Sequence, residues 1–199
     1  TASLTAITGT GSTTASGRKV HLYGDITQSG AVTLTQLGSG GNYQDAIELK
    51  KAGTTTITAG SISISGDVGK DNGDGNTLNL DTSAANGTIA LDISLGRSGV
   101  MYIPVAFSAN AGTGAINVTG TGMADSGWRS TPVTLTGGAV TVGVNVYSNA
   151  AFTLANSSDS TVTGVLSGSM AFTKQGSGKL TLSGANTFSG GLTSAGGNL

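Results

Sequence analysis

The sequence predicts an all-β protein, specifically a parallel β-helix in which short strands stack coil upon coil. Val, Ile and Leu alternate with polar residues in short runs along most of the chain, the pattern of half-buried strands. These runs end at Gly, Asn or Asp, which favour turns. The string SGAVTLTQLGSGG at 29–41 also aligns without a gap with SGSMAFTKQGSGK at 167–179. Recurring strand-and-turn units are typical of stacked repeats.

We expect a strand wherever apolar residues alternate. Residues 1–17 fit either an edge strand or a frayed end. Residues 43–52, YQDAIELKKA, fit either a helical turn or a strand, and the sequence leaves this open. The other expected strands are marked by Val20 and Leu22, Ile26, Val32 and Leu34, Ile57, Ile62 and Ile64, Val68, Leu78 and Leu80, Ile89–Leu95, Val100–Phe107, Ile116 and Val118, Val133 and Leu135, Val140–Val146, Phe152 and Leu154, and Val162–Leu166.

One alternative architecture is a β-sandwich followed by a short β-helical repeat. The string VTLTGGAVTV around Gly137-Gly138 reads as a two-residue hairpin, and Asn86-Gly87 offers another. In a β-helix, the same apolar residues would point inward and stack on their equivalents in the next coil. Thr and Ser would face outward, because Thr favours strands and neither residue repels its neighbour in the next coil. The internal recurrence favours the β-helix.

The composition narrows the range of partners. The chain has 199 residues, 10% of them charged, and a net charge of −1. We therefore predict no nucleic-acid partner, because the phosphate backbone requires clustered Lys and Arg. No apolar run is long enough to span a bilayer, so we expect no membrane insertion by this segment. We expect residues 1–199 to be a single β-helical segment of a longer chain.

The C-terminal stretch FTKQGSGKLTLSGANTFSGGLTSAGGNL, at 172–199, carries the most specific motif. It resembles the passenger-associated transport repeat (autotransporter-associated β-strand repeat) of Gram-negative autotransporters. The resemblance implies a right-handed parallel β-helix, export through the outer membrane and folding outside the cell. The matching residues are Lys174, Gly176, Gly178, Leu180, Leu182, Ser183, Gly184, Asn186, Phe188, Gly190 and Leu199.

The loop at 69–76, GKDNGDGN, is the candidate calcium site. Counted from Lys70, calcium-loop positions 3, 5 and 12 are Asn72, Asp74 and Asp81, with Gly75 at position 6. Position 1 is a lysine, which cannot bind a cation, so a loop of simple Asn-Gly and Asp-Gly turns is the competing interpretation. We therefore predict no cofactor, with calcium as the exception to test.

A catalytic site is not expected. The sole histidine, His21, alternates with Val20 and Leu22 and is interpreted as a surface residue. Glycoside hydrolysis needs two carboxyl groups across one groove, and Asp25, Asp67 and Asp92 would have to share one face to supply them. Trp128 is the best candidate for an exposed contact. A carbohydrate-active β-helix enzyme is thus an alternative that the positions of the carboxylates can test.

We expect a structural or adhesive stalk, or passenger segment, of a surface-displayed bacterial protein, not an enzyme. Its place would be extracellular or at the outer-membrane surface of a Gram-negative-type bacterium. The alternative is a self-assembling subunit of an extracellular filament or surface layer, since open strand edges can pair end to end. A host-surface or glycan receptor is the remaining partner to consider.

Overall fold

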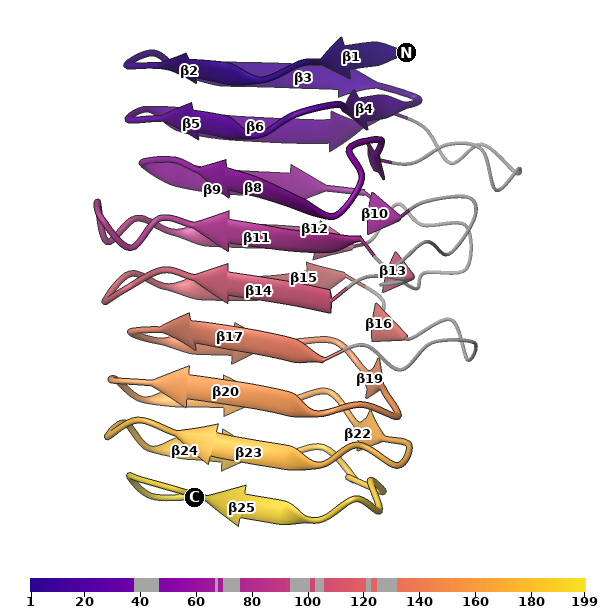
Figure 1. Ribbon diagram of the computed structural model, residues 1–199. Helices are drawn as coiled ribbons and strands as arrows, with labels where there is room; N and C mark the ends of the chain where they lie inside the picture. Colours follow the sequence, from indigo (N-terminus) through magenta and orange to yellow (C-terminus); the bar gives the residue numbers. More distant parts are fainter. Residues whose placement is uncertain are drawn as a thin grey trace.

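A computed structural model describes residues 1–37, 47–66, 68–69, 76–93, 101–102, 106–120, 123–124 and 132–199. These residues form 25 β-strands and no helix. The strands pair in parallel sheets, and the successive coils stack as a β-solenoid (Figure 1). The predicted all-β class and the predicted parallel β-helix are confirmed. Within the described residues no helix is long and apolar enough to cross a membrane.

Two long sheets form two sides of the solenoid. The nine-stranded sheet contains, in spatial order, β2 (Ile7–Gly9), β5 (Ile26–Gln28), β8 (Thr54–Thr58), β11 (Thr77–Asp81), β14 (Ala106–Asn110), β17 (Val133–Gly137), β20 (Phe152–Asn156), β23 (Phe172–Gln175) and β25 (Leu192–Ser194). The eight-stranded sheet contains β3 (Thr13–Gly17), β6 (Ala31–Gln36), β9 (Ser61–Ser65), β12 (Ile89–Ile93), β15 (Ile116–Gly120), β18 (Val140–Val142), β21 (Ser160–Val162) and β24 (Leu180–Leu182).

Two four-stranded sheets form the third side. The first contains β1 (Ala2–Leu4), β4 (Val20–Leu22), β7 (Ile47–Leu49) and β10 (Val68–Gly69). The second contains β13 (Met101–Tyr102), β16 (Met123–Ala124), β19 (Val146–Tyr147) and β22 (Leu166–Ser167). The second continues the first along the stack, with β13 beyond β10 (Figure 1). A coil therefore visits the third side, the nine-stranded sheet and the eight-stranded sheet in turn.

The strand order rules out the hairpins of the β-sandwich alternative. Strands β17 and β18 flank Gly137-Gly138 but belong to different sheets. Asn86, with φ of 52°, likewise lies at the corner between β11 and β12, which also belong to different sheets. A glycine pair or a left-handed Asn can turn a corner as readily as a hairpin. The β-sandwich alternative is therefore wrong for the described residues.

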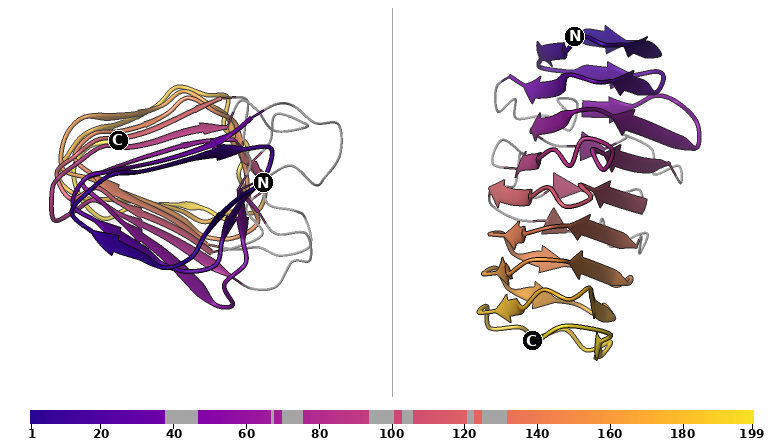
Figure 2. Two further views of the ribbon diagram at one scale, coloured as in Figure 1. Left: turned by 90° about the horizontal axis from the view of Figure 1, so that it is seen from above. Right: turned by 90° about the vertical axis from the view of Figure 1, so that its left-hand side faces the viewer.

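The coils surround one common interior, seen from above in Figure 2. Stacked columns of apolar side chains form the core inside it. In one column, Ile62, Ile89, Ile116 and Val140 occupy neighbouring positions in four successive strands of the eight-stranded sheet. Each of the four is 1% exposed or less. Burying a side chain of this size contributes roughly 1.5–3 kcal/mol. One continuous core therefore joins the coils, in agreement with the alternation in the sequence.

Two segments that the sequence left open now have a structure. Residues 1–17 contain the strands β1, β2 and β3. In the 43–52 segment, Ile47–Leu49 is the strand β7, and Ile47 and Leu49 are fully buried. Residues 43–46 lie outside the described residues. Where the segment is described, the strand interpretation is correct, because β7 pairs with β4 and β10 in register.

The internal sequence echo does not mark equivalent positions. Its first copy contains β6 of the eight-stranded sheet, whereas its second copy contains β23 of the nine-stranded sheet. Both sheets need the same alternation followed by a glycine corner, so their strings align although they form different sides. The structural repeat is instead the coil, and in the C-terminal part it has a constant length. Phe152 pairs with Phe172, and Phe172 pairs in turn with Leu192, at equal intervals along the chain.

Candidate functional site: the C-terminal repeat

Residues 172–199 build the last described coils of the solenoid. Strand β23 lies in the nine-stranded sheet, β24 in the eight-stranded sheet, and β25 returns to the nine-stranded sheet. Leu180 stacks on Ser160 and is fully buried, whereas Leu182 is partly buried and packs against the core. Ser183 is exposed. Leu180 and Leu182 therefore point inward, as the alternation predicts.

Lys174 has an unusual position for a charged residue, because it occupies an inward-facing place in β23. It lies between Leu154 of β20 and Ser194 of β25 in the ladder and is 0% exposed. Its Nζ donates hydrogen bonds to the backbone carbonyls of Gln175 at 3.0 Å and Gly176 at 2.8 Å. Burial lowers the pKa of this ammonium group, since desolvation disfavours the charged form.

The position of Lys174 could have been found from the sequence. It falls two residues after Phe172, on the same phase of the alternation, so the strand pattern alone places it inside. What the sequence does not show is how the charge is accommodated. The ammonium group binds the corner that follows β23, where the carbonyls of a tight turn offer acceptors. Lys174, the first residue of the motif, is thus a buried side chain that holds the adjacent corner by binding its carbonyls.

Two motif glycines show why larger residues do not fit. Gly176 has φ of 80°, and a Cβ there would lie 2.1 Å from the carbonyl oxygen of Asn156 in the preceding coil. A Cβ at Gly184 would lie 2.3 Å from the carbonyl oxygen of Gly164. Both distances are far inside van der Waals contact, so these corners must lie close to the coil before. These two motif positions therefore require glycine because the backbone of the preceding coil is too close for a side chain.

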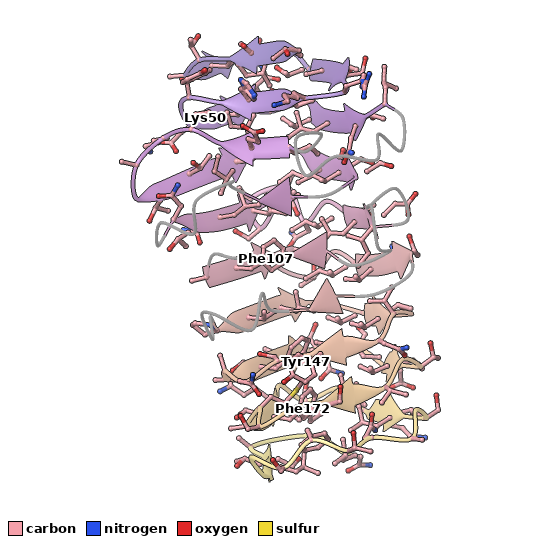
Figure 3. All side chains as sticks on the ribbon, turned by 90° about the vertical axis from the view of Figure 1, so that its right-hand side faces the viewer. Lys50, Phe107, Tyr147 and Phe172 are labelled. Carbon is pink, nitrogen blue, oxygen red and sulfur yellow. The ribbon has the colours of Figure 1, made fainter. Side chains whose placement is uncertain are left out.

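Asn186 and Phe188 bind the repeat to the coil before it. The Asn186 Oδ1 accepts a hydrogen bond of 2.8 Å from the backbone N–H of Leu166 in that coil. Phe188 packs on Phe172 with ring centroids 6.0 Å apart, and Phe172 stacks on Phe152 at 5.6 Å. Figure 3 shows Phe172 near the C-terminal end of the stack. The polar and aromatic motif positions therefore both act between coils, as contacts that hold the stack together.

The candidate calcium ligands are only partly described. Asn72 and Asp74 lie outside the described residues. Asp81 ends β11, and its Oδ1 accepts hydrogen bonds from the Ser83 backbone N–H at 2.9 Å and the Ser83 hydroxyl at 2.6 Å. This carboxylate is thus used in a local turn at a corner. The calcium site stays a prediction.

Of the three carboxylates considered for sugar chemistry, the two that the structure describes lie apart. Asp25 precedes β5 of the nine-stranded sheet, where Oδ2 binds Lys51 Nζ at 2.6 Å and Oδ1 accepts the Thr56 N–H at 2.8 Å. Asp92 lies in β12 of the eight-stranded sheet. Asp67 and Trp128 lie outside the described residues. Asp25 and Asp92 are therefore on different sides of the solenoid and do not form a pair across one groove.

A buried carboxylate on the third side was missed by sequence reasoning. Glu48 is 1% exposed and faces His21, its ladder neighbour, with His21 Nε2 to Glu48 Oε2 at 3.3 Å. Lys50 forms an ion pair with the same oxygen, and Lys19 Nζ lies 3.7 Å from Oε1. Figure 3 shows Lys50 in the N-terminal third, far along the stack from Phe172. His21 lies on the opposite face of β4 from Val20 and Leu22, but its side chain is only 16% exposed, so the prediction of a surface residue is wrong and His21 belongs to this charged cluster.

Comparison with known proteins identifies one segment. Residues 172–199 match the family model described as the passenger-associated transport repeat, which confirms the resemblance of the motif. No curated protein matches the chain, and no solved structure does. The chain thus carries an autotransporter passenger-like segment in its last described coils.

Proposed function

From the premise that residues 172–199 are a passenger-associated transport repeat, we propose that this chain is a structural segment of a surface-displayed passenger. It would serve as a rigid stalk that holds other parts of its protein away from the outer membrane. The observation that supports this proposal most directly is that residues 172–199 belong to the same solenoid as the preceding coils. The strands β23 and β24 continue the two long sheets without a break in register.

The mechanical side of the proposal rests on the stacking. Parallel strands about 4.8 Å apart bind each coil to its neighbours by backbone hydrogen bonds along every side. Columns such as Ile62 to Val140 add a shared core. A rod bonded in this way resists bending, because bending would separate several strands and open the core at once. Such a rod suits a spacer better than a site that must open and close.

The proposed location follows from the same repeat. A passenger-like segment is exposed at the cell surface of a Gram-negative bacterium. The composition suits that environment, because stability would not depend on disulfides in a chain without cysteine. Each coil can also fold onto the preceding one through nearest-neighbour contacts. An adhesive role for loops of the stalk would add a receptor, which remains a prediction.

A display experiment tests this function. The chain is placed between a secretion signal and an outer-membrane translocator domain in a Gram-negative host, and intact cells are probed with antibody before and after protease treatment. We expect surface exposure and a protease-resistant core. Leu180→Asp should lower the resistant fraction, because it puts a carboxylate at a fully buried position, whereas exposed Ser183→Asp should behave like the parent. Retention in the periplasm, or complete surface digestion of the parent chain, would overturn the proposal.

A further inference from the structure

The corner between β11 and β12 contains the dipeptide Asn86-Gly87, and the stacking of the coils constrains both of its residues. Figure 1 shows this corner at the left-hand edge of the stack. Asn86 has φ of 52°, which makes it the one described residue other than glycine with positive φ. Asn adopts this left-handed conformation more readily than most residues with a side chain. The backbone of the corner therefore favours Asn at position 86.

Position 87 leaves room for glycine alone. A Cβ at Gly87 would lie 1.7 Å from the carbonyl oxygen of Gly60 in the preceding coil. This distance is far shorter than a van der Waals contact, so a side chain here would push the two coils apart. The fold thus places an Asn directly before a Gly at this corner for physical reasons. The sequence contains a second such pair, Asn72-Gly73, which lies outside the described residues.

An Asn followed by a Gly carries two groups that can react with each other. The backbone nitrogen of the Gly can attack the carboxamide carbon of the Asn, because a five-membered ring forms and no side chain on the Gly hinders the approach. The new carbon–nitrogen bond closes a cyclic imide, and the bond from the carboxamide carbon to its own nitrogen breaks. That nitrogen leaves as ammonia, with the proton that the backbone nitrogen gives up. Water then opens the imide to Asp or to isoaspartate.

In the folded corner both reacting groups are held by other partners. The Asn86 Oδ1 accepts a hydrogen bond of 2.9 Å from the backbone N–H of Thr113, which belongs to the following coil. The backbone N–H of Gly87 donates to the carbonyl of Thr82 at 3.2 Å, and the Thr82 hydroxyl donates to the Gly87 carbonyl at 2.8 Å. Ring closure needs a Gly87 nitrogen that can lose its proton and a carboxamide that is free to turn onto it. The reaction therefore competes with these hydrogen bonds.

The bond from Thr113 is the part of this arrangement that depends on another coil. The bonds to Thr82 lie within the corner itself, whereas Thr113 is 27 residues further along the chain than Asn86. Asn86 is exposed, so burial does not keep water away from its carboxamide. The two corners are in close contact, since a Cβ at Gly112 would lie 2.5 Å from the Asn86 Oδ1. The carboxamide is thus held only while the next corner is stacked on it.

The two products of the reaction differ in how they fit the corner. Asp at position 86 keeps an acceptor oxygen for the Thr113 N–H and leaves the backbone unchanged. Isoaspartate adds one methylene group to a backbone that contacts coils on both sides. A Cβ at Gly114 would already lie 2.5 Å from the backbone carbonyl oxygen of Asn86, and Gly87 lies against Gly60 on the other side. Isoaspartate therefore disturbs the stacking that Asn and Asp permit.

We propose that Asn86-Gly87 is a deamidation site whose rate is set by the stacking of the following coil. When Thr113 is in place, the carboxamide is held and the site converts slowly. When the following coil is unfolded or detached, the site reacts at the rate of a free Asn-Gly peptide, and the isoaspartate that forms opposes restacking. The corner thus limits the time in which the chain can fold without damage. This inference does not depend on the stalk role.

Peptide mapping of the purified chain measures the conversion. The chain is kept at neutral pH and body temperature, either folded in buffer or unfolded in guanidinium chloride. The peptide that contains residue 86 is followed by mass spectrometry, with separation of its Asn, Asp and isoaspartate forms. We expect many-fold slower conversion in the folded chain than in the unfolded chain, and isoaspartate in the unfolded chain. Equal rates in the two states overturn the proposal.

Two substitutions at one position separate the Thr113 hydrogen bond from a general loss of structure. Thr113→Pro removes the backbone N–H that binds Asn86, and the folded variant should convert several-fold faster than the parent. Thr113→Ala is the matched control, because it keeps the N–H and should convert at the parent rate. Circular dichroism melts establish that each variant is folded. A folded Thr113→Pro that converts at the parent rate, or a Thr113→Ala that converts as fast as the proline variant, overturns the proposal.

A second measurement needs no variant and applies even where the proline variant does not fold. Guanidinium chloride is raised in steps below the unfolding transition, and hydrogen exchange of the Thr113 N–H is measured beside the conversion of Asn86. The two rates should increase in parallel, since both require the same opening of the corner. Conversion that stays constant while the Thr113 N–H opens overturns the proposal.

Discussion

The coils before and after residue 132 are held together in different ways. In the earlier coils, hydrogen bonds from backbone N–H groups to side-chain oxygens of another coil join residues 19, 23, 31 and 27 positions apart. In the later coils, the four bonds of this kind each join residues 20 positions apart. The earlier coils also contain the ion pairs Lys51–Asp25 and Lys50–Glu48.

The difference shows what a constant coil length makes possible. When every coil has the same length, side chains of the same type return to equivalent positions in successive coils. They can then stack on one another, as the rings of Phe152 and Phe172 do. When the length varies, each contact must be built separately, and charged pairs appear. The coils of the C-terminal repeat therefore have a constant length and repeated contacts, whereas the earlier coils vary in length and in their contacts. The predictions below test that contrast.

The largest effect is expected at the core column of the regular coils. Leu180→Asp should lower the free energy of unfolding by about 4 kcal/mol or more, because a carboxylate without a partner would replace a fully buried side chain. Ser183→Asp, at an exposed position of the same coil, should change it by less than about 0.5 kcal/mol. Urea unfolding of both variants gives the comparison. Similar losses in the two would contradict the inward and outward assignment.

The aromatic stack should come next. Phe172→Ala should cost about 3 kcal/mol, because it leaves a cavity between Phe152 and Phe188. Phe188→Ala should cost less, since Phe188 is only partly buried. Thermal melts of the two variants rank them. A larger loss of stability in Phe188→Ala would mean that Phe188, and not Phe172, makes the main contribution to the aromatic stack.

Replacing the buried lysine should lower the free energy of unfolding by about 1 kcal/mol at neutral pH, because in Lys174→Met the carbonyls of Gln175 and Gly176 lose their donor. Because the pKa of Lys174 is lowered in the folded state, the unfolded chain binds more protons between the folded pKa and 10.5. Wild-type stability should therefore rise with pH across that window relative to the variant.

Unfolding measured from neutral to strongly alkaline pH tests this dependence on Lys174. The exposed residue Lys179 gives the control, and the difference between wild type and Lys179→Met should show no such change with pH. A difference between wild type and Lys174→Met that stays constant with pH would show that the buried amine does not titrate in the folded state.

The smallest effect belongs to the earlier coils. Hydrogen bonds from Lys51 and from the Thr56 N–H lower the pKa of Asp25. Its contribution is present above the ordinary carboxyl pKa and is lost as pH falls through the lowered one. Asp25→Asn should cost about 0.5 kcal/mol at pH 7, since the pair is partly exposed, and nothing in strong acid. Asp159→Asn, at an exposed position, should have the same free energy of unfolding as wild type at every pH. An equal loss of stability in Asp159→Asn would show that the Lys51–Asp25 pair has no specific role.

The sequence was sufficient for the fold class and for most of the core. Alternation placed Ile62, Leu180 and Phe172 inside, because a two-residue period leaves little choice of face. It could not assign strands to sides of the solenoid, since both long sheets use the same pattern. For this reason the strings around β6 and β23 align in sequence although the two strands lie in different sheets. It also missed Glu48, whose burial depends on neighbours that are distant in the chain. The motif residues were found by resemblance, whereas their contacts between coils required the structure.

The central claim is that the described coils form one rigid stack in continuous register. Spin labels at Thr14 of β3 and Thr181 of β24, two exposed residues in the end strands of the eight-stranded sheet, measure this directly by electron–electron dipolar spectroscopy. Seven steps of about 4.8 Å predict a separation of about 34 Å with a narrow distribution. A broad distribution, or a mean shorter by more than about two coil spacings of 4.8 Å, would contradict a continuous rigid solenoid.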